Sequence, residues 1–424
     1  GLVGSTIDVV GEGFAQASAV RLGSKAATFS VESDTLLHAV VPAGVSSGKI
    51  TVETPRGTRV SAGTFAVILK PTVSSFSPSA AELPATLTLT TVGWLAVEGA
   101  NQMTSLNGLQ NLTSVERADF YGIPLLTDLS ALSKLTSVDQ LSISQTAIGS
   151  LHGLENLTTA RQLAIGGNPN LTSIDALSQL TRLSGLYLEG APGLTSLAAL
   201  SNVRELSRID LSGLGIATLD GLVGLVGPAS LGVTRCPQLT SIGALGSPAV
   251  SWLNLDDNAA LQDCGTVLPT ADAEVRVTRS YALTSLGCLS QATSLRSLTV
   301  EHTAITSLDA LSNLTRVDYQ LVISGGNVQT LAPLQNLTTA YNLVVGYTSI
   351  ADLHGLENLT GLGSLALYYN LGLRSLHELT SLTELSYADI EYNWNLSQCE
   401  VDWLDTRTGD AVIYSVGNGE ACSP

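Results

Sequence analysis

The sequence predicts two folds in series: an all-β sandwich over residues 1–70 and a solenoid of short coils over residues 94–395. Strand-like alternation punctuated by Gly and Asp indicates the sandwich. A leucine motif that returns every 22 or 23 residues indicates the solenoid, because self-similarity at a short fixed period is the signature of repeat architectures. Leucine and small residues carry the burial, since only 5% of the chain is aromatic.

The first segment, residues 1–70, reads as short strands separated by turns. Alternation of apolar and polar residues is clearest at 36–41 and 49–52. A stretch at 71–78 resembles the opening of an immunoglobulin-like family, and no such stretch precedes Gly1, so we expect a first strand or a tandem domain upstream. The family is the IPT/TIG group, and four stretches carry the resemblance: Gly11-Glu12-Gly13-Phe14, Ser33-Asp34-Thr35, Val41-Pro42-Ala43-Gly44 and Gly48-Lys49-Ile50-Thr51-Val52.

Residues 71–93 are predicted to form a linker and the N-terminal cap of the solenoid. Trp94, Leu95 and Val97 are expected to add a strand ahead of the first full repeat. A solenoid needs such a cover because its terminal coil would otherwise expose the core.

The solenoid is predicted from thirteen repeat units. Each carries a form of LxxLxLxxN, as at 160–168, 183–191 and 362–370. Leu163 and Ile165 alternate as on a short strand, and the Gly, Asn and Pro residues after them predict the turn that leaves it. A unit of 22 residues has no room for a long helix, so short 3₁₀ or extended segments are expected on the return path. The units open at Met103, Leu126, Ile148, Leu171, Leu194, Ile216, Leu239, Leu261, Leu283, Ile305, Val328, Ile350 and Leu373, with a partial unit at Leu396.

Asparagine recurs at two places in the repeat. The Asn that ends the motif is predicted to be buried, with its amide bonded to backbone groups of the turn. A second Asn stands in Asn-Leu-Thr or Asn-Leu-Ser, which matches a glycosylation acceptor. Most of these share one repeat position, so the repeat itself is the favoured explanation of Asn111, Asn156, Asn170, Asn313, Asn336, Asn358 and Asn395.

The units resemble leucine-rich repeats. Short units with a return segment such as LTSLDALSNLT are similar to those of internalin-like bacterial surface proteins. The resemblance extends over all thirteen units and implies a right-handed leucine-rich-repeat solenoid, with a parallel sheet on its concave side and short segments on its convex side. Residues 396–424, where the repeat stops, are expected to form the C-terminal cap.

The five cysteines predict an oxidised protein. Cys399 and Cys422 bracket the C-terminal cap, and a disulfide that closes about 23 residues would stabilise the fold by about 3 kcal/mol. Cys264 and Cys288 lie on neighbouring coils at nearly the same convex position, which is compatible with a second bridge. Two bridges imply an extracellular or cell-surface location. The alternative is five reduced core thiols, and Cys236 is expected to be a buried free thiol in either case.

Charge and hydropathy limit the partner. The formal net charge is −17, and residues beyond 70 hold 13 Lys/Arg against 31 Asp/Glu. This balance argues against nucleic acid and anionic membranes, and it fits either simple solubility or a cationic partner. No apolar run reaches the roughly 18 residues of a membrane span, so membrane insertion is not expected.

Sequence motifs for catalysis are not found: neither a nucleophile elbow, nor a phosphate loop, nor a zinc-protease helix. We therefore expect no enzyme, no catalytic residues and no cofactor. His152 and His354 stand in the same phrase, LHGLENLT, which repetition explains better than a site. Asp256, Asp257 and Asn258 offer oxygen ligands for calcium, but the full loop spacing is absent and no metal is expected.

A candidate binding surface is predicted on the concave face, where the residues flanking each core leucine point to solvent. Tyr and Trp are favoured at recognition surfaces because they bring large contact area at little cost in entropy. The alternative is that these side chains merely cover their own strands. The predicted site combines aromatic and acidic residues: Trp252, Asp256, Tyr347, Tyr368, Tyr369, Tyr387, Asp389, Glu391 and Tyr392.

These observations predict an extracellular bacterial recognition or adhesion protein. It would bind a protein or a glycan on another cell or surface through the concave face. The alternative is a structural spacer or self-assembling fibre component, so self-association is also considered. A binder should expose aromatic residues on the concave side, whereas a spacer should expose apolar patches at its edges or convex side.

Overall fold

The computed structural model describes residues 4–65, 72–73, 89–225, 229–245, 248–265, 267–409 and 411–420. These residues form two compact units, and the boundary falls between Val73 and Trp94. A two-residue strand, β8 (Thr72–Val73), lies at this boundary. Most of the predicted linker and cap, residues 74–88, is outside the described residues.

The N-terminal unit is all-β, as predicted, and consists of two antiparallel sheets in the orders β1-β5-β4 and β3-β2-β6-β7. Strand alternation builds its core: Leu37 and Ala39 are fully buried, while His38 between them lies on the opposite face of the sheet. The 3₁₀ turn η1 (Phe14–Gln16) adds Phe14 to this core. The strands are β1 (Thr6–Val10), β2 (Ala19–Leu22), β3 (Lys25–Ala27), β4 (Phe29–Val31), β5 (Leu36–Val40), β6 (Ile50–Thr54) and β7 (Gly57–Val60).

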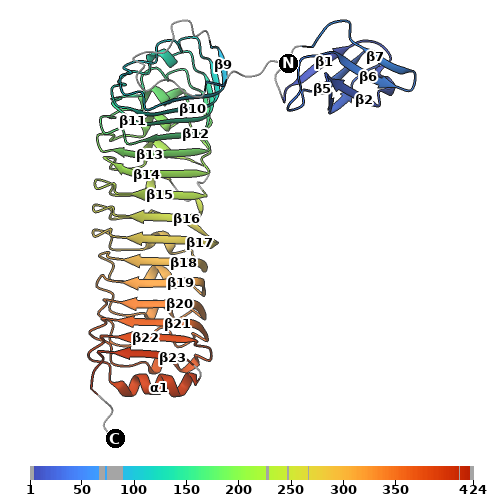
Figure 1. Ribbon diagram of the computed structural model, residues 1–424. Coiled ribbons are helices and arrows are strands. Elements are labelled where there is room, and N and C mark those ends of the chain that lie inside the picture. The colour runs from blue at the N-terminus through green and yellow to red at the C-terminus, as the bar shows by residue number, and fades with distance from the viewer. Residues whose placement is uncertain are drawn as a thin grey trace. The chain divides into compact units, whose positions relative to one another are not determined.

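The C-terminal unit is a ladder of strands in a single sheet (Figure 1). From β10 to β23, each strand pairs in parallel with the next strand along the chain. Each predicted unit supplies one strand, β10 to β22, and the two ends add β9 and β23. The strands are β9 (Thr91–Glu98), β10 (Ser114–Ile123), β11 (Ser137–Thr146), β12 (Thr159–Gly166), β13 (Gly185–Ala191), β14 (Arg208–Leu214), β15 (Ser230–Thr234), β16 (Ala249–Asp256), β17 (Leu268–Thr278), β18 (Ser294–Glu301), β19 (Arg316–Ser324), β20 (Thr339–Gly346), β21 (Gly361–Tyr368), β22 (Tyr387–Glu391) and β23 (Val412–Val416).

The core lies inside the coils and is built mainly of leucine. Leu163 and Ile165 point inward from β12 and are 0% and 3% exposed. On the return path, Leu151, Leu154 and Leu157 are spaced by three residues and are all fully buried. Coils of 22 or 23 residues, each with one parallel strand and such a core, define the leucine-rich-repeat fold, and this chain has that fold.

Short 3₁₀ turns occupy the return path, as the length of the unit predicts. In η2 (Ser130–Leu132), the Leu132 N–H donates to the Leu129 carbonyl at 2.8 Å. The Asp128 carboxylate accepts the Ser130 N–H at 2.8 Å and so satisfies a backbone donor at the start of the turn. The other turns are η3 (Asp175–Gln179), η4 (Ala198–Leu200), η5 (Asp220–Leu222), η6 (Gly243–Leu245), η7 (Gly287–Leu289), η8 (Asp309–Leu311), η9 (Ala332–Leu334) and η10 (His377–Ser381).

Both kinds of asparagine bond to neighbouring coils. The motif residue Asn168 is fully buried, donates to the Ile143 carbonyl at 2.9 Å and accepts from the Thr146 N–H at 3.0 Å, which confirms its predicted role. In the Asn-Leu-Thr phrase, Asn156 Nδ2 donates to the Ser133 carbonyl of the preceding coil at 2.7 Å. The same bond recurs for Asn313, Asn336 and Asn358, and Asn395, at a different repeat position, donates to the Leu371 carbonyl of the preceding coil. The repeat therefore has a structural use for this phrase.

The C-terminal cap contains a helix that the sequence analysis did not predict, α1 (Gln398–Thr408) (Figure 1). It buries only Val401 and Leu404, so its apolar periodicity is weak. The helix follows Ser397 and ends at Gly409, whose φ of 72° suits a glycine. No helix among the described residues is long and apolar enough to cross a membrane.

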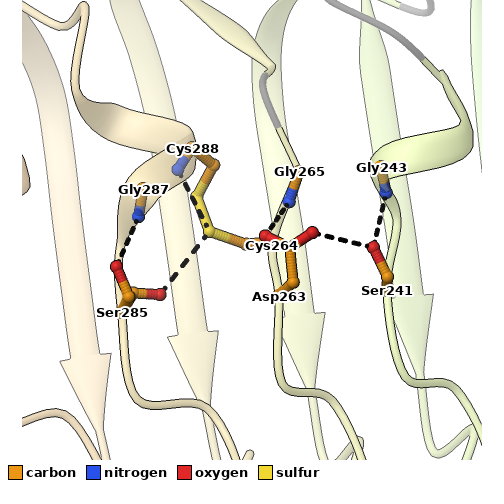
Figure 2. Close-up of a disulfide and its surroundings, with 8 residues drawn as sticks. All are labelled: Ser241, Gly243, Asp263, Cys264, Gly265, Ser285, Gly287 and Cys288. Atoms are coloured by element: carbon orange, nitrogen blue, oxygen red, sulfur yellow. Dashed lines mark hydrogen bonds between the residues drawn. A yellow bond between two sulfur atoms is a disulfide. The ribbon is translucent and has the colours of Figure 1, made fainter.

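The cysteines lie in the coils and the cap. A disulfide joins Cys264 to Cys288 on two neighbouring coils of the return path (Figure 2). The Cys288 N–H also donates to Cys264 Sγ at 3.3 Å. Cys236 is a buried free thiol. Cys399 is disulfide-bonded, and its predicted partner Cys422 lies outside the described residues.

Candidate functional site

The outward-facing residues of β9–β23, which we call the concave face, form rows across the sheet. The parallel register places equivalent residues of successive coils side by side, as in the row Ser324, Gly346, Tyr368 and Glu391. Neighbouring strands are about 4.8 Å apart, so side chains in one row lie within reach of each other.

A left-handed residue lies at or just after the C-terminal end of the strand in every coil from β9 to β23. Glycine occupies this position in seven coils, and a residue with a side chain and a φ of 49–57° occupies it in eight. Left-handed backbone costs a non-glycine residue roughly 1–2 kcal/mol, so these eight positions carry strain. They are Gln145, Arg235, Asp257, Arg279, His302, Tyr347, Tyr369 and Tyr392.

Three of these strained positions lie close together and all are tyrosine. The rings of Tyr347 and Tyr369 are stacked with centroids 4.8 Å apart, and those of Tyr369 and Tyr392 are stacked at 4.9 Å. We call these residues the tyrosine stack. Glycines bound it on both sides, because the same position holds Gly325 in the coil before and Gly417 in the coil after. A Cβ at Gly417 would lie 2.5 Å from the Tyr392 ring, so that glycine makes room for the last ring.

Tyr368 extends the stack onto the concave face. Its ring lies over Gly346 of the preceding coil, where a Cβ would come within 2.2 Å of it, and it meets the Tyr347 ring edge-on with centroids 5.7 Å apart. Burial raises the pKa of Tyr368 above its ordinary value, and the charge of Glu301 adds to this effect. The tyrosine hydroxyl therefore stays protonated at neutral pH and can donate a hydrogen bond.

Acidic side chains lie next to the tyrosines. Glu391 is the register partner of Tyr368, and Asp389 lies between Tyr387 and Glu391 in sequence and faces the same side. The Asp389 Oδ1 atom is buried and accepts no hydrogen bond from the described residues.

Trp252 belongs to a different cluster, so the predicted site is not one contiguous patch. The Arg208 guanidinium lies 5.6 Å from the Tyr187 ring centre and 6.0 Å from the Trp252 ring centre. Its Nε is 2.6 Å from Asp210 Oδ2, so the Arg208 guanidinium already forms an ion pair within the protein. Trp252 is on β16 and Tyr347 follows β20, four strands away, or about 19 Å.

Asp256 and its neighbours are committed to the fold. The Asp256 carboxylate is paired with Arg279 and accepts a hydrogen bond from Thr278. Asn258 is buried; its Oδ1 accepts a hydrogen bond from the Cys236 N–H, and its Nδ2 donates to the Val233 carbonyl. No group of three or more metal-binding side chains occurs among the described residues.

Sequence reasoning missed three exposed tyrosines of the same coils: Tyr319, Tyr341 and Tyr414, which are 53%, 61% and 54% exposed. A signal was present, because Tyr341 is the first variable residue of its LxxLxL strand and Tyr414 alternates with Val412 and Val416. Eight of the eleven tyrosines lie between residues 319 and 414. Residues 316–420 also hold 3 Lys/Arg and 12 Asp/Glu, a net charge of −9 out of −17.

Comparisons with known proteins find only distant likenesses. No protein-family model matches the sequence, and no curated protein matches it. Among solved structures, an internalin of Listeria monocytogenes is 21% identical over 78% of this chain and 82% of its own, with a TM-score of 0.41. A leucine-rich-repeat protein of Leptospira interrogans is 13% identical over 78% and 94%, with a TM-score of 0.38. One from Bacteroides eggerthii is 12% identical over 77% and 61%, with a TM-score of 0.42. The leucine-rich-repeat fold of this chain rests on its own coils rather than on these likenesses.

Proposed function

We propose that this protein is a non-enzymatic recognition protein that binds another protein through the C-terminal part of its concave face. The tyrosine stack is the observation that carries the proposal. In three consecutive coils a bulky residue, Tyr347, Tyr369 or Tyr392, takes left-handed backbone where glycine would be free of strain. Strain of this kind persists where surrounding contacts compensate for it, and it gathers at binding and catalytic sites.

The chemistry of the surface favours a protein over a glycan. A sugar ring stacks on a free aromatic face, but the facing sides of the three stacked rings are already occupied. The stack therefore offers ring edges and hydroxyl groups, with the carboxylates of Asp389 and Glu391 beside them. Such a surface suits a partner that presents apolar side chains together with Lys or Arg. Glycan binding stays as the alternative.

The setting of this function is part of the same proposal. A disulfide between Cys264 and Cys288 supports an extracellular or cell-surface location, because disulfides persist in oxidising compartments. The N-terminal unit would be an immunoglobulin-like module of the IPT/TIG type that carries the repeat domain on a bacterial surface, where the protein acts in adhesion. Its two antiparallel sheets are compatible with that identity.

The test is the double variant Tyr368→Ala with Tyr392→Ala, measured against a partner found by screening surface proteins and glycan panels. Each aromatic removed from a binding hot spot costs about 2 kcal/mol or more, so affinity should fall by a factor of several hundred. Binding should also weaken with added salt, because the acidic groups act largely through the association rate.

The matched control is Tyr121→Ala with Tyr281→Ala, which removes two exposed tyrosines outside the stack. Circular dichroism must show that both variants are folded. Unchanged affinity in the first variant, together with loss of binding on convex substitutions, would sink the proposal.

Self-assembly is a second candidate function, and one observation favours it. Among the described residues, β23 is the terminal strand of the sheet and exposes Val412, Tyr414 and Val416. An exposed, apolar edge strand is prone to pair with another chain. Sedimentation of the parent and of Val412→Lys with Val416→Lys distinguishes the two candidates, since only an assembling protein shows association that the lysines abolish.

A further inference from the structure

A cleft of about 340 Å³ lies where strands β19 to β22 begin, on the opposite edge of the sheet from the tyrosine stack. Its lining includes Tyr341, Gly361, Gly363 and Glu384, and we call it the tyrosine cleft. None of these residues belongs to the tyrosine stack. Tyr341 is 61% exposed and its ring lies against Gly363, where a Cβ would come within 2.9 Å of it. The glycine therefore makes room for the ring.

The same molecule contains a second cleft at the equivalent place on β10 to β13, with a volume of about 450 Å³. Its lining residues correspond coil by coil to those of the tyrosine cleft. In this second cleft, Arg161 donates from Nε and Nη2 to the two carboxylate oxygens of Asp139, at 2.7 and 3.0 Å. We call it the arginine cleft. Its repeat position thus accommodates a guanidinium group held by a carboxylate.

The tyrosine cleft lacks that guanidinium. Gly363 stands at the repeat position of Arg161, and Tyr341 stands at the position of Asp139. The arginine side chain is thereby absent, and the Tyr341 ring lies over the glycine that replaces it and forms a wall of the cleft. A planar guanidinium stacks on such a ring more readily than a compact ammonium does.

The charge of the tyrosine cleft also favours a bound cation. Glu384 stands at the repeat position of Arg182, so a cation in one cleft is an anion in the other. The second acid of the cleft, Asp318, is neutralised by Arg316, whose Nε is 2.8 Å from Oδ1. Across the described part of the chain, no cation lies within ion-pair distance of the Glu384 carboxylate.

Two atoms of the tyrosine cleft are positioned to receive a donor. Glu384 Oε2 lies 3.8 Å from the point where Gly361 would carry a Cβ, so the carboxylate reaches over this glycine. The hydroxyl of Thr339, on the strand before, is buried and has no hydrogen-bond partner among the described residues. A carboxylate can accept two parallel N–H bonds from one guanidinium.

We propose that the tyrosine cleft binds the guanidinium group of an arginine side chain presented by a second protein. The guanidinium stacks on the exposed Tyr341 ring and donates to Glu384. The net charge of −9 in residues 316–420 attracts a basic partner to this end of the solenoid. That the arginine comes from a protein rests on the proposed function, whereas the guanidinium site itself does not.

The test uses N-acetyl-argininamide as the probe and the full chain with ¹³C-labelled tyrosine rings. The Tyr341 signal is assigned from its loss in Tyr341→Phe. We expect a saturable shift of this signal with the arginine probe. N-acetyl-citrullinamide has the same shape without the charge and should produce no shift, and N-acetyl-lysinamide should bind more weakly than arginine.

Two variants test the carboxylate. Glu384→Gln keeps the size of the side chain and should weaken binding about tenfold, because a charge-assisted hydrogen bond becomes a neutral one. Glu384→Arg restores the residue of the arginine cleft and should abolish binding. Asp139→Asn, in the arginine cleft, is the control and should leave the Tyr341 titration unchanged.

Three results would overturn the proposal: no saturable shift at Tyr341, an equal shift with citrulline, or unchanged binding in Glu384→Gln. Lysine binding as tight as arginine would overturn the guanidinium assignment. Because the probe replaces the partner, these results are independent of the tyrosine-stack experiment. Probe binding with no effect of Tyr368→Ala and Tyr392→Ala on partner affinity would leave the cleft established and the concave-face proposal refuted.

Discussion

At the scale of the residue, the left-handed position at the end of each strand shows how neighbours decide whether strain is tolerated. Left-handed backbone costs Gln145 and Tyr369 similar amounts, roughly 1–2 kcal/mol each. Tyr369 recovers this through two stacked ring pairs, each contributing about 0.5–1.5 kcal/mol beyond burial. Gln145 has no stacked ring to offset its strain.

Replacing these two residues by glycine should therefore have opposite effects. Gln145→Gly should raise the free energy of unfolding by up to about 1 kcal/mol, because strain is relieved and little contact is lost. Tyr369→Gly should lower it by about 2 kcal/mol, because two ring pairs are lost. Urea denaturation followed by circular dichroism measures both, and a stabilised Tyr369→Gly would contradict the compensation argument.

His38 makes the N-terminal unit sensitive to pH. Its Nδ1 is 2.8 Å from Asp8 Oδ1 and its Nε2 is 2.6 Å from Glu32 Oε2. These two hydrogen bonds, first to Glu32 and then to Asp8, raise the pKa of His38 above its ordinary value of 6.5. The folded protein therefore holds the proton more tightly than the unfolded chain.

The sign of the pH effect follows from this raised pKa. The contribution of His38 to stability is fully present below pH 6.5 and is lost as the pH rises through the pKa of the folded state. NMR titration of the His38 ring should show the raised pKa, and urea denaturation on both sides of it should show the loss of stability. In His38→Gln the pH dependence of the N-terminal unit should flatten, and a variant that keeps it would exclude this histidine as the cause.

At the scale of the element, the coils are joined by two asparagine positions of unequal importance. Asn370 is fully buried, accepts from Thr348 N and Oγ1 and donates to the Val345 carbonyl at 2.9 Å. Asn358 donates to the Gln335 carbonyl at 2.8 Å, but from an exposed site. Loss of a partner is costly only where water cannot replace it.

The two asparagines should respond differently to truncation. Asn370→Ala leaves a buried carbonyl and a buried N–H without hydrogen-bond partners. It should therefore lower the free energy of unfolding by about 3 kcal/mol. Asn358→Ala should lower it by less than about 1 kcal/mol, because water takes over the exposed bond. The comparison is made by urea denaturation of the two single variants, and equal effects would refute the assignment of separate roles.

An element of this chain can be predicted from the sequence when its pattern recurs with the 22- to 23-residue repeat. Leu163 and Ile165 could be placed inside β12 because the LxxLxL alternation recurs in thirteen units and one face is always apolar. Helix α1 could not, because it occurs once and buries only two residues of eleven. Its only local signals were Ser397 before it and Gly409 after it.

Site contacts were less predictable than the elements. Alternation assigns Tyr368 and Trp252 to the outer face of the sheet. It does not show that Tyr368 leans over Gly346, or that Trp252 pairs with Arg208 two strands away. These contacts depend on which small residue occupies the preceding coil, which the repeat pattern alone does not reveal.

At the scale of the whole molecule, each described strand of the solenoid hydrogen-bonds only to the strands on either side of it. The parallel register passes from strand to strand without a crossover from β10 to β23. Stability is then a sum of coil terms and nearest-neighbour terms. A coil is therefore a unit that can be removed without destroying the rest.

Deletion of one complete coil, Leu171 to Gly193, should leave a folded and slightly less stable protein. The break points fall at equivalent positions of successive units, so β12 and β14 can pair directly. Deletion of only half the coil, residues 171–181, should unfold the neighbouring coils, because the next strand loses its return segment. Far-UV circular dichroism and thermal unfolding measure both, and equally folded or equally unfolded products would contradict modularity.

The bridge between two neighbouring coils also determines how the solenoid responds to tension. The hydrogen bonds between strands run along the axis of the ladder, so a pull at its two ends opens them one coil at a time. Each released coil of about 22 residues lengthens the chain by about 75 Å. Cys264 and Cys288 are separated by 24 residues, and that loop stays closed while the disulfide is intact. Reduction adds about 80 Å to the fully stretched length. The redox state of one disulfide thus sets part of the length to which this chain can be pulled.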